Sequence, residues 1–317
     1  MYTHKMNLSD QLINHIAIQE AAIQNPDSYG IEVELEGKNF VNPPDIVKLY
    51  WNGTKDGSLR VKAPGDCALE YVTRYPFNMI TTEKAITSLF GYLTSPGVKV
   101  YDSYRTSIHV HVNFAMESFR TIYNMMTISL ILDELLVSQN GEHRIGNNFC
   151  LRAKDALGQV QSLIHSIGNG HNFFDVPGND RYSSINFASL MKFGSIEFRS
   201  LECTTHEGRL LHWIGTLSEM KKAAKRYNNP VEIIQQFSML GPKQFLVGIL
   251  GPYATKYMNV DGMEDMLFGG MRIAQDLAFC SEWNELTLAD IEADKAKQAK
   301  KEAEMVAYIK KKAKQFQ

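Results

Sequence analysis

The sequence has almost no excess charge of either sign. Its 317 residues include 33 Lys and Arg against 35 Asp and Glu, which gives a formal net charge of −2. A chain so close to neutral is not a general binder of nucleic acid or other polyanions. It also has only four cysteines, far apart and without a CxxC pair: Cys67, Cys150, Cys203 and Cys280. No Cys/His cluster at zinc-finger spacing is present, and this usage favours a reducing compartment.

Long hydrophobic runs are missing as well. The most apolar stretch, Met125 to Val137, contains Asp133 and Glu134, whereas a membrane span needs about 18 apolar residues. The first residues lead into a polar helical pattern rather than the basic start and apolar core of a signal peptide. We therefore expect a soluble, cytoplasmic protein without a membrane partner.

The residues that are present have the composition of an ordinary folded protein. Apolar residues make up 44% of the chain and charged residues 21%, with 22 Gly and 10 Pro. This composition excludes disordered and fibrous classes. The length allows two domains of about 150 residues or one larger α+β domain, and no change in composition divides the chain.

Two segments alternate strictly between apolar and polar residues, as a strand with one buried face does. Tyr29 to Glu36 reads YGIEVELE, and Ser107 to Phe114 reads SIHVHVNF. Shorter strands are predicted at Val47 to Trp51, Ala68 to Thr73, Tyr182 to Ala188 and Gly194 to Ser200. A turn at Met191 and Lys192 should join the last two strands into an antiparallel hairpin.

Helical spacing of apolar residues predicts the remaining elements. A first helix ends at Asn25 and Pro26, and two more cover Thr82 to Leu93 and Ser118 to Val137. After Thr205 nearly all of the chain is predicted to be helical, in segments at Glu207 to Tyr227, Pro230 to Ser238, Lys243 to Leu250, Met263 to Phe279 and Thr287 to Lys314. The Lys-rich last helix fits a solvated surface helix or, less well, a docking element for an acidic partner or nucleic acid.

Three glutamates, Glu32, Glu34 and Glu36, share the polar face of the first long strand. Unpaired carboxylates cost several kcal/mol each when they are buried, so these side chains need water or cations. Two interpretations stay open from this strand alone. One is an antiparallel sheet with a solvated face. The other is a site for a hard cation such as Mg²⁺, because alternate residues on a strand stand about 6 to 7 Å apart.

Polar side chains recur at similar positions on the other predicted strands: Glu70, His109, His111, Arg181, Asn186, Glu197 and Arg199. His109 and His111 alone would fit a zinc pair, contacts to phosphate or exposed residues of a solvated face. Taken together, four strands whose non-core faces carry Glu, His and Arg fit a site for a cation and a polyphosphate better than an accidental polar surface.

Six motifs follow one another between Gly30 and Ser200: GIEVELEG, DGSLR, LEYVTRYP, SIHVHVN, RYSSIN and SIEFRS. In this order they resemble the putative amidoligase family of the glutamine synthetase and glutamate-cysteine ligase superfamily. The resemblance covers about the first two thirds of the chain. LEYVTRYP departs from the family pattern, which more often has Ser and small or proline residues there. That departure leaves the substrate open and points to Arg74 and Tyr75 at its entrance.

The resemblance implies a role for each matching position. It makes Glu32, Glu34, Glu70 and Glu197 the ligands of Mg²⁺, His109, His111, Arg181 and Asn186 the contacts of the nucleotide, and Arg144, Arg181 and Arg199 the catalytic arginines. Glu70 is alternatively a contact for a substrate ammonium group, and the match at Arg144, in EHRIGNNFC, is looser than the others.

The resemblance further implies an ATP- and Mg²⁺-dependent ligase that joins a carboxylate substrate and an amine substrate. ATP would phosphorylate the carboxylate, and the amine would displace phosphate from the acyl phosphate. Such chemistry requires no Ser or Cys nucleophile, and the sequence shows neither a nucleophile elbow nor the P-loop pattern GxxxxGK[ST]. Phosphoryl transfer depends mainly on positioning and charge neutralisation, which carboxylates with Mg²⁺ and forked guanidinium groups supply.

Two other functions stay open. A Zn²⁺ hydrolase would use His109 and His111, but it would leave four other residues without a joint purpose: Glu32, Glu34, Arg181 and Arg199. A binding protein could keep the ligase fold without turnover and dock a partner through its helical C-terminal third. Such a protein would bind nucleotide without releasing ADP.

The expected fold is α+β, with a curved, mainly antiparallel sheet that has one polar face, helices on its other face and a helical C-terminal third. Residues 1–227 would form the catalytic domain, and 228–317 a helical extension packed on it. The loop His165 to Asn179 fits a lid or a variable surface loop. A homo-oligomer is left open, no nucleic-acid partner is expected, and a phage-encoded protein would work in the host cytoplasm.

Overall fold

Eight antiparallel strands form one sheet in the computed structural model, which describes residues 20–168 and 182–284 and a few separate residues between 295 and 306. The strands are β1 (Ser28–Lys38), β2 (Trp51–Thr54), β3 (Cys67–Thr73), β4 (Phe77–Asn78), β5 (Lys99–Val100), β6 (Ser107–Asn113), β7 (Ile185–Asn186) and β8 (Ser195–Glu202). Their order is β2-β3-β1-β6-β8-β7, while β4 and β5 pair with β1. Every pairing between these strands is antiparallel.

The helices in the described ranges fall into two groups along the chain. Those before β8 are α2 (Glu20–Gln24), α3 (Asp45–Lys48), α4 (Met79–Leu93), α5 (Phe119–Gln139), the 3-10 helix η1 (Glu142–Arg144), α6 (Leu157–Gly168) and α7 (Ser189–Phe193). Those after it are α8 (Glu207–Ala224), α9 (Pro230–Leu240), α10 (Pro242–Leu250), the 3-10 helix η4 (Gly251–Lys256) and α11 (Met263–Ala278). The predicted α+β class and helical C-terminal part are confirmed.

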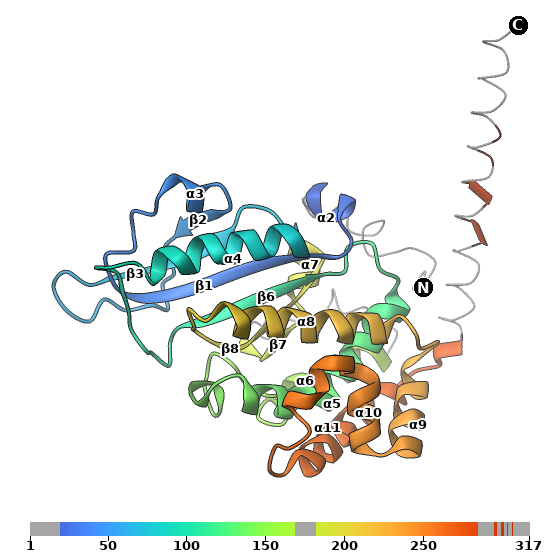
Figure 1. The fold of residues 1–317 in the computed structure, drawn as a ribbon. Helices are drawn as coiled ribbons and strands as arrows, with labels where there is room; N and C mark the ends of the chain where they lie inside the picture. The colour runs from blue at the N-terminus through green and yellow to red at the C-terminus, as the bar shows by residue number, and fades with distance from the viewer. Residues whose placement is uncertain are drawn as a thin grey trace, which may run out of the picture.

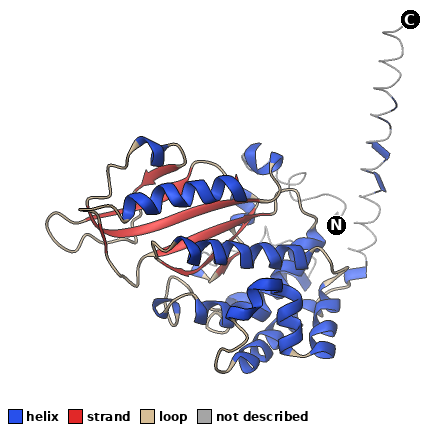
Figure 2. Ribbon diagram, viewed as in Figure 1, coloured by secondary structure: helices blue, strands red, loops and turns tan. Residues whose placement is uncertain are grey.

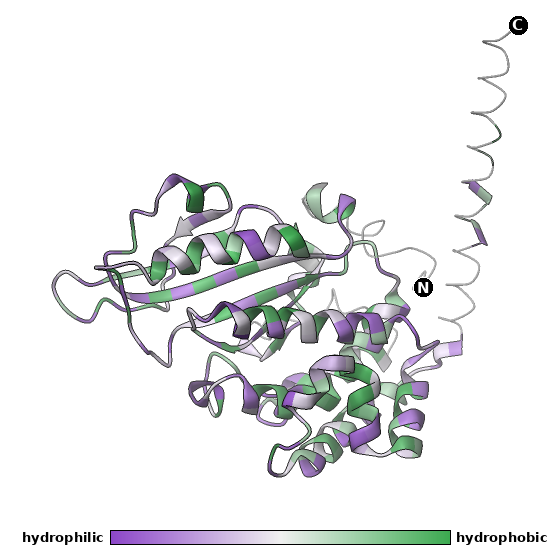
Figure 3. Cartoon of the chain, in the orientation of Figure 1, coloured by the Kyte–Doolittle hydropathy of each residue, from purple (hydrophilic) through white to green (hydrophobic). Residues whose placement is uncertain are grey.

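Helices α4 and α8 run along one face of the sheet (Figures 1 and 2). The apolar side chains of β1, Ile31, Val33 and Leu35, are buried with Leu89 and Phe90 of α4 in one hydrophobic core. Hydrophilic and hydrophobic bands therefore alternate along β1 in Figure 3. The alternation leaves the other face of the sheet to polar side chains, as the sequence predicts.

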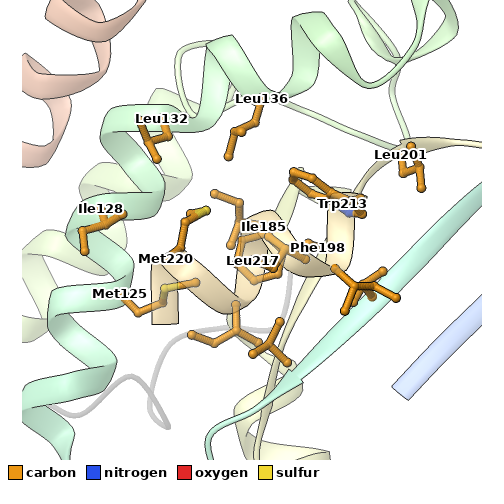
Figure 4. Close-up of a cluster of buried hydrophobic side chains, with 14 of the residues drawn as sticks. Met125, Ile128, Leu132, Leu136, Ile185, Phe198, Leu201, Trp213, Leu217 and Met220 are labelled. Carbon is orange, nitrogen blue, oxygen red and sulfur yellow. The ribbon is translucent and has the colours of Figure 1, made fainter. Parts of the chain in front are cut away.

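A second part of the core lies between α5, α8 and β8 (Figure 4). Phe198 of β8 meets Trp213 of α8 edge to face, with ring centroids 6.2 Å apart and an interplanar angle of 84°. Leu217 and Met220 of α8 and Met125 of α5 are completely buried in the same cluster. This packing fixes β8 against two helices, and β8 carries part of the polar face.

Helix α5 is the central helix of the core. Ser118 caps it by accepting a hydrogen bond from the Thr121 N–H. Among the described helices it is the one long and apolar enough to cross a membrane, but 89% of its apolar window is buried inside the fold. It packs against α8, α9 and α11, so its apolar surface belongs to the protein interior.

Several predicted boundaries were wrong for local reasons. The stretch before Trp51 is not a strand, because Pro44 and Asp45 start the short helix α3, and β2 begins only at Trp51. The hairpin pairing is confirmed, but β7 has only two residues. Its connection to β8 is helix α7, which ends at Gly194 in the left-handed conformation (φ +66°), rather than a tight turn.

The predicted loop from His165 was wrong at its start, because residues up to Gly168 continue helix α6; 169–181 lie outside the described residues. The start of the first predicted helix and nearly all of the Lys-rich last helix also lie outside them. The division at residue 227 stays a prediction, although α11 packs along α5 and α9.

Asp133 of α5 joins three separate parts of the fold through a buried carboxylate. Its Oδ2 accepts the Ala153 N–H at 2.6 Å, and its Oδ1 accepts the Ser184 hydroxyl just before β7. The Ser184 carbonyl in turn accepts the Arg199 N–H of β8 at 2.8 Å. Burial raises the pKa of Asp133 to about 6, although both hydrogen bonds lower it.

We predict that Asp133 makes the fold less stable as pH rises from about 4 to about 6. Its pKa is 3.8 when unfolded and higher when folded, so its contribution is fully present below pH 4 and lost above the folded value. A shift of this size corresponds to roughly 3 kcal/mol. In urea unfolding at several pH values, the stability of the wild type relative to Asp133→Asn should fall by about 1 to 3 kcal/mol across this window. A pH-independent difference would contradict the assignment.

Candidate active site

The polar face of the sheet gathers seven acidic and histidine side chains, called here the carboxylate cluster: Glu32, Glu34, Asp56, Glu70, His109, His111 and Glu197. Six of them come from strands β1, β3, β6 and β8, and Asp56 comes from the loop after β2. The strand register brings them together. Glu32 stands opposite His109, Glu34 opposite Glu70, and His111 opposite Glu197.

Glu32 is the shared centre of the carboxylate cluster. Its Oε2 lies 3.0 Å from Nδ1 of His109, and its Oε1 lies 3.3 Å from Nε2 of His111. His109 Nδ1 is also 3.3 Å from Oε1 of Glu197. The other nitrogen of each histidine is close to a serine, Nε2 of His109 at 2.8 Å from Ser107 Oγ and Nδ1 of His111 at 3.0 Å from Ser195 Oγ. These contacts fix both rings.

Three groups of ligand atoms in the carboxylate cluster are close enough to hold a metal ion. They are Glu34 with Asp56 and Glu70, Glu32 with Glu70 and His109, and Glu32 with His111 and Glu197. Within each group the ligand atoms lie within 4.8 Å of one another. Neighbouring groups share Glu70 or Glu32, so two cations bound in adjacent groups would share one of these carboxylates.

The donor atoms fit hard divalent cations. The group of Glu34, Asp56 and Glu70 contains carboxylates alone, which Mg²⁺ prefers. The other two groups each add one imidazole nitrogen to two carboxylates, a set that Mn²⁺ also accepts. Nε2 of His111 is buried, and the Glu32 carboxylate 3.3 Å away is its ionic contact, so both side chains direct donor atoms to the same place. In the described part of the chain, no group within this distance contains both histidines.

Glu197 is held in place by two partners on its own side of the sheet. Asn186 of β7 donates its amide to Oε2 at 2.7 Å, and Arg199 donates Nη1 to Oε1 at 2.5 Å. Asn186, predicted to contact the nucleotide, therefore orients a carboxylate of the cluster. Arg199 is predicted to be catalytic, and the structure places its guanidinium directly beside the cluster.

Electrostatics divide the carboxylates into two kinds. Burial raises the pKa of Glu32, but the neighbouring His111 and His109 together bring it well below its usual range. Burial likewise raises the pKa of Glu197, and His111 and Arg199 bring it below its usual range. For Glu70, burial and the charge of Glu32 outweigh the hydrogen bond from Thr54 and the charge of His109, and they raise its pKa to about 7. One carboxylate of the cluster thus has less compensation by positive charge than the others.

Two predicted arginines are less tied to the carboxylate cluster. Arg144 is completely buried and donates Nη2 to the Arg199 carbonyl at 2.8 Å, so its side chain lies against the backbone of β8. Its Nε and Nη1 have no hydrogen-bond partner, and its charge lowers the pKa of the Cys150 thiol against the effect of burial. Arg181 lies outside the described residues. The catalytic roles of both stay predictions.

Sequence reasoning missed two members of the site. Asp56 belongs to the motif DGSLR, but a lone carboxylate in a loop has no pattern that predicts a role for it. Ser107 donates its hydroxyl to Oε2 of Glu34 at 2.6 Å while it contacts His109. Ser107 lies on the same strand face as His109 and His111, so the alternation of β6 was the signal that could have found it.

The match to known families comes from the middle of the chain. Residues 76–220 match the family model described as "Putative amidoligase enzyme". No curated protein matches the chain. The match confirms the resemblance over this span, which includes His109, His111, Asn186, Glu197 and Arg199. An amidoligase forms amide bonds, and that is the class of activity the family supports.

The carboxylates of β1 and β3 lie before the matched span. Glu32, Glu34 and Glu70 nevertheless meet its histidines and Glu197 because β1 pairs with β6 and β3 pairs with β1. The matched span and the strands before it thus build one site.

We predict that Glu70→Gln stabilises the protein when divalent cations are removed. The folded pKa of Glu70 is raised above its unfolded value, so stability is lost as pH rises from 4.5 to about 7. At about pH 8 with EDTA, the variant should gain on the order of 1 to 2 kcal/mol after solvent screening. With Mg²⁺ or Mn²⁺ it should gain less stability than the wild type does.

The control is Glu264→Gln, an exposed glutamate that pairs with Lys243 at 3.1 Å far along the chain from the sheet. Unfolding by heat or urea, with EDTA and with each cation, measures both effects. A Glu70→Gln variant that is less stable in EDTA, and that keeps the full gain with Mn²⁺, would show that Glu70 is not a cation ligand.

Proposed function

We propose that the protein is an ATP- and Mg²⁺-dependent ligase that joins a carboxylate and an amine through an acyl phosphate. The observation that carries the proposal is the carboxylate cluster, in which three groups of cation ligands share Glu32 and Glu70 across one sheet. The amidoligase match supports the amide-forming class of reaction. The proposal adds three things to the family match: the use of a nucleotide, the use of a cation and the acyl-phosphate intermediate.

The charge on the sheet supports a cation and phosphate site. Five carboxylates meet two histidines, with the guanidinium of Arg199 beside them, so the cluster is short of positive charge. Buried carboxylates without compensation are costly, and divalent cations are the compensation that carboxylate ligands recruit. Bound cations in turn attract the phosphates of a nucleotide.

The reaction needs two displacements. A carboxylate oxygen of the first substrate attacks the γ-phosphorus of ATP, and ADP leaves. The nitrogen of the amine then attacks the carbonyl carbon of the acyl phosphate, loses a proton, and inorganic phosphate leaves. Phosphorylation supplies the good leaving group, so the protein itself needs no covalent nucleophile.

The side chains have separate parts in this scheme. Glu34, Asp56 and Glu70 would hold one Mg²⁺, and Glu32 with His111 and Glu197 would hold another. Bound Mg²⁺ supplies neutralisation of the phosphate charge. Arg199 presents a fork of donors next to Glu197, which suits a phosphoryl oxygen or a substrate carboxylate.

The zinc hydrolase alternative is weaker on this geometry. It needs both histidines on one ion, whereas His109 and His111 fall into different ligand groups among the described residues. A zinc site would also leave the group made only of carboxylates without a purpose. The binding protein without turnover differs from the ligase only in ADP release, and an assay separates the two.

We predict that Mg²⁺ with ATP raises the thermal midpoint of the wild type and that Glu34→Gln abolishes this shift. A ligand at about 100 times its dissociation constant stabilises a fold by about 2.7 kcal/mol. Glu197→Gln should weaken the same effect. The control is Glu36→Gln, a buried glutamate on the same strand that belongs to none of the three ligand groups. An equal shift in Glu34→Gln and Glu36→Gln would show that the nucleotide does not bind on this face.

Arg199→Lys should keep nucleotide affinity and lower turnover by about 10²-fold, because an ammonium group cannot replace a forked guanidinium in the transition state. Arg209→Lys is the matched control, since Arg209 also donates Nη1 to a glutamate oxygen, Oε1 of Glu202 at 2.9 Å. ADP release with a panel of carboxylates and amines, and capture of the acyl phosphate by hydroxylamine, measure turnover. Equal rates in wild type and Arg199→Lys would exclude a catalytic role for Arg199.

A further inference from the structure

A pocket of about 100 Å³ opens beside the carboxylate cluster, and neither the cation groups nor the family match assigns it a ligand. Its polar edge contains Glu32, His111 and Ser195, and its apolar walls include Val72, Tyr75 and Phe193. We call it the Tyr75 pocket. Because Glu32 and His111 belong to both, anything bound in the pocket lies next to the place where the reaction is proposed to occur.

Two aromatic rings form walls of the Tyr75 pocket and are only partly covered by protein. Tyr75 is 57% exposed and Phe193 is 40% exposed. Phe193 meets the His111 ring edge to face, with centroids 5.6 Å apart at 89°. Gly194 follows it with φ +66°, and a Cβ there would come within 2.9 Å of the Ala115 Cβ, so the backbone that holds Phe193 requires glycine. The chain thus holds an aromatic ring at the entrance of a polar site.

The charges around the Tyr75 pocket favour a cationic ligand. No Lys or Arg is among its lining residues within the described ranges, and the carboxylate of Glu32 is at its edge. Lys192 stacks its ammonium 4.6 Å from the Phe193 ring and does not line the pocket. Arg199 directs Nη1 to Glu197. His111 is the cationic group at the edge of the pocket, and it is already paired with Glu32 at 3.3 Å. A bound carboxylate would therefore face Glu32 without an unpaired cation among the lining residues, whereas an ammonium group would be attracted.

The size of the Tyr75 pocket limits what its apolar walls can hold. An apolar cavity of about 150 Å³ is known to accept benzene, and this pocket is smaller. The pocket is open to solvent on one side, so this volume limits only the part of a ligand that the walls enclose, and a branched chain of three or four carbons fits there. The apolar and aromatic walls would take up such a group by burial of apolar area.

We propose that the Tyr75 pocket binds the short aliphatic side chain of the amine substrate, with the amino group toward Glu32. This inference rests on the proposed ligase function and specifies the class of its second substrate. The amine would then approach the acyl carbon from the Glu32 and His111 end of the carboxylate cluster. Tyr75 and Phe193 would be specificity-determining residues that contact the part of the substrate that does not react.

Isobutylamine is the probe, with the full-length chain in EDTA and ligand-observed NMR as the measurement, so that no Mg²⁺ neutralises the Glu32 carboxylate that attracts the ammonium group. Its dissociation constant should be in the millimolar range, as expected for a ligand with so few atoms. Tyr75→Ala and Phe193→Ala should each weaken binding about tenfold, the usual effect of losing part of an apolar pocket. Tyr75→Phe should bind as the wild type does, because the ring rather than the hydroxyl forms the wall.

The matched control is Phe268→Ala. Phe268 is 42% exposed and packs edge to face on Phe237, much as Phe193 does on His111, but it belongs to α11. This variant should leave isobutylamine binding unchanged. Tyr75 is well exposed, so Tyr75→Ala should fold even if Phe193→Ala disturbs His111.

Three comparisons would overturn the proposal. Isobutyrate, which has the same branched skeleton with a carboxylate, should bind more weakly than isobutylamine; equal or tighter binding would reverse the assignment of charge. Displacement of isobutylamine by adenosine would assign the pocket to the nucleobase. Equal affinity in wild type and Tyr75→Ala would place the amine elsewhere.

Failure of the inference can be told apart from failure of the ligase function. Tyr75→Ala should retain the full thermal shift with Mg²⁺ and ATP. If the wild type shows no such shift but binds isobutylamine through Tyr75, the pocket assignment holds and the ligase function fails. If the shift is present and isobutylamine binds equally well to the wild type, Tyr75→Ala and Phe193→Ala, only the pocket assignment fails.

Discussion

The structure of the site depends on the register of β1 between β3 and β6. That register places Glu32 opposite His109 and Glu34 opposite Glu70, and the β6 and β8 pairing places His111 opposite Glu197. A slip of one residue would turn the glutamates of β1 into the core and its apolar side chains outward. The burial of Ile31, Val33 and Leu35 therefore holds the carboxylates together, and the core energy is what offsets their mutual repulsion.

Much of this could be predicted from the sequence because strands have a period of two. The alternation of YGIEVELE and SIHVHVNF separates core residues from polar residues correctly, and it put Glu32, Glu34, His109 and His111 on polar faces. Which strands are neighbours is not a local property, so the contact of Glu70 with the β1 carboxylates followed only from the resemblance. Asp56 lies in a loop, where no periodicity marks it. Helix α3 starts after Pro44, and α7 ends at Gly194 in the left-handed conformation, so both depend on single residues rather than on a repeating pattern.

The carboxylate cluster places several negative charges close together on one face of the sheet. Glu32 and Glu197 are compensated by histidines and Arg199, while Glu70 has a pKa near neutrality because burial and Glu32 act on it together. A sequence selected only for stability would not place five carboxylates on one buried face. Their retention is explained if a cation is part of the working state, since the free energy of cation binding then includes relief of this repulsion.

The kinds of side chain on the polar face change from one side of the sheet to the other. The group made only of carboxylates lies on the Glu34 side, the mixed groups follow through Glu32, and the aromatic pocket comes after His111. At the Glu36 end, the Lys62 ammonium contacts that glutamate and the Arg60 backbone N–H donates to it, whereas no Lys or Arg lines the pocket within the described ranges. The proposed ligase reaction would use such an asymmetry, because an anionic, phosphate-bearing group and an amine would reach one carbon atom from environments of opposite character. The asymmetry arises because successive strands place different residues on the same face of the sheet.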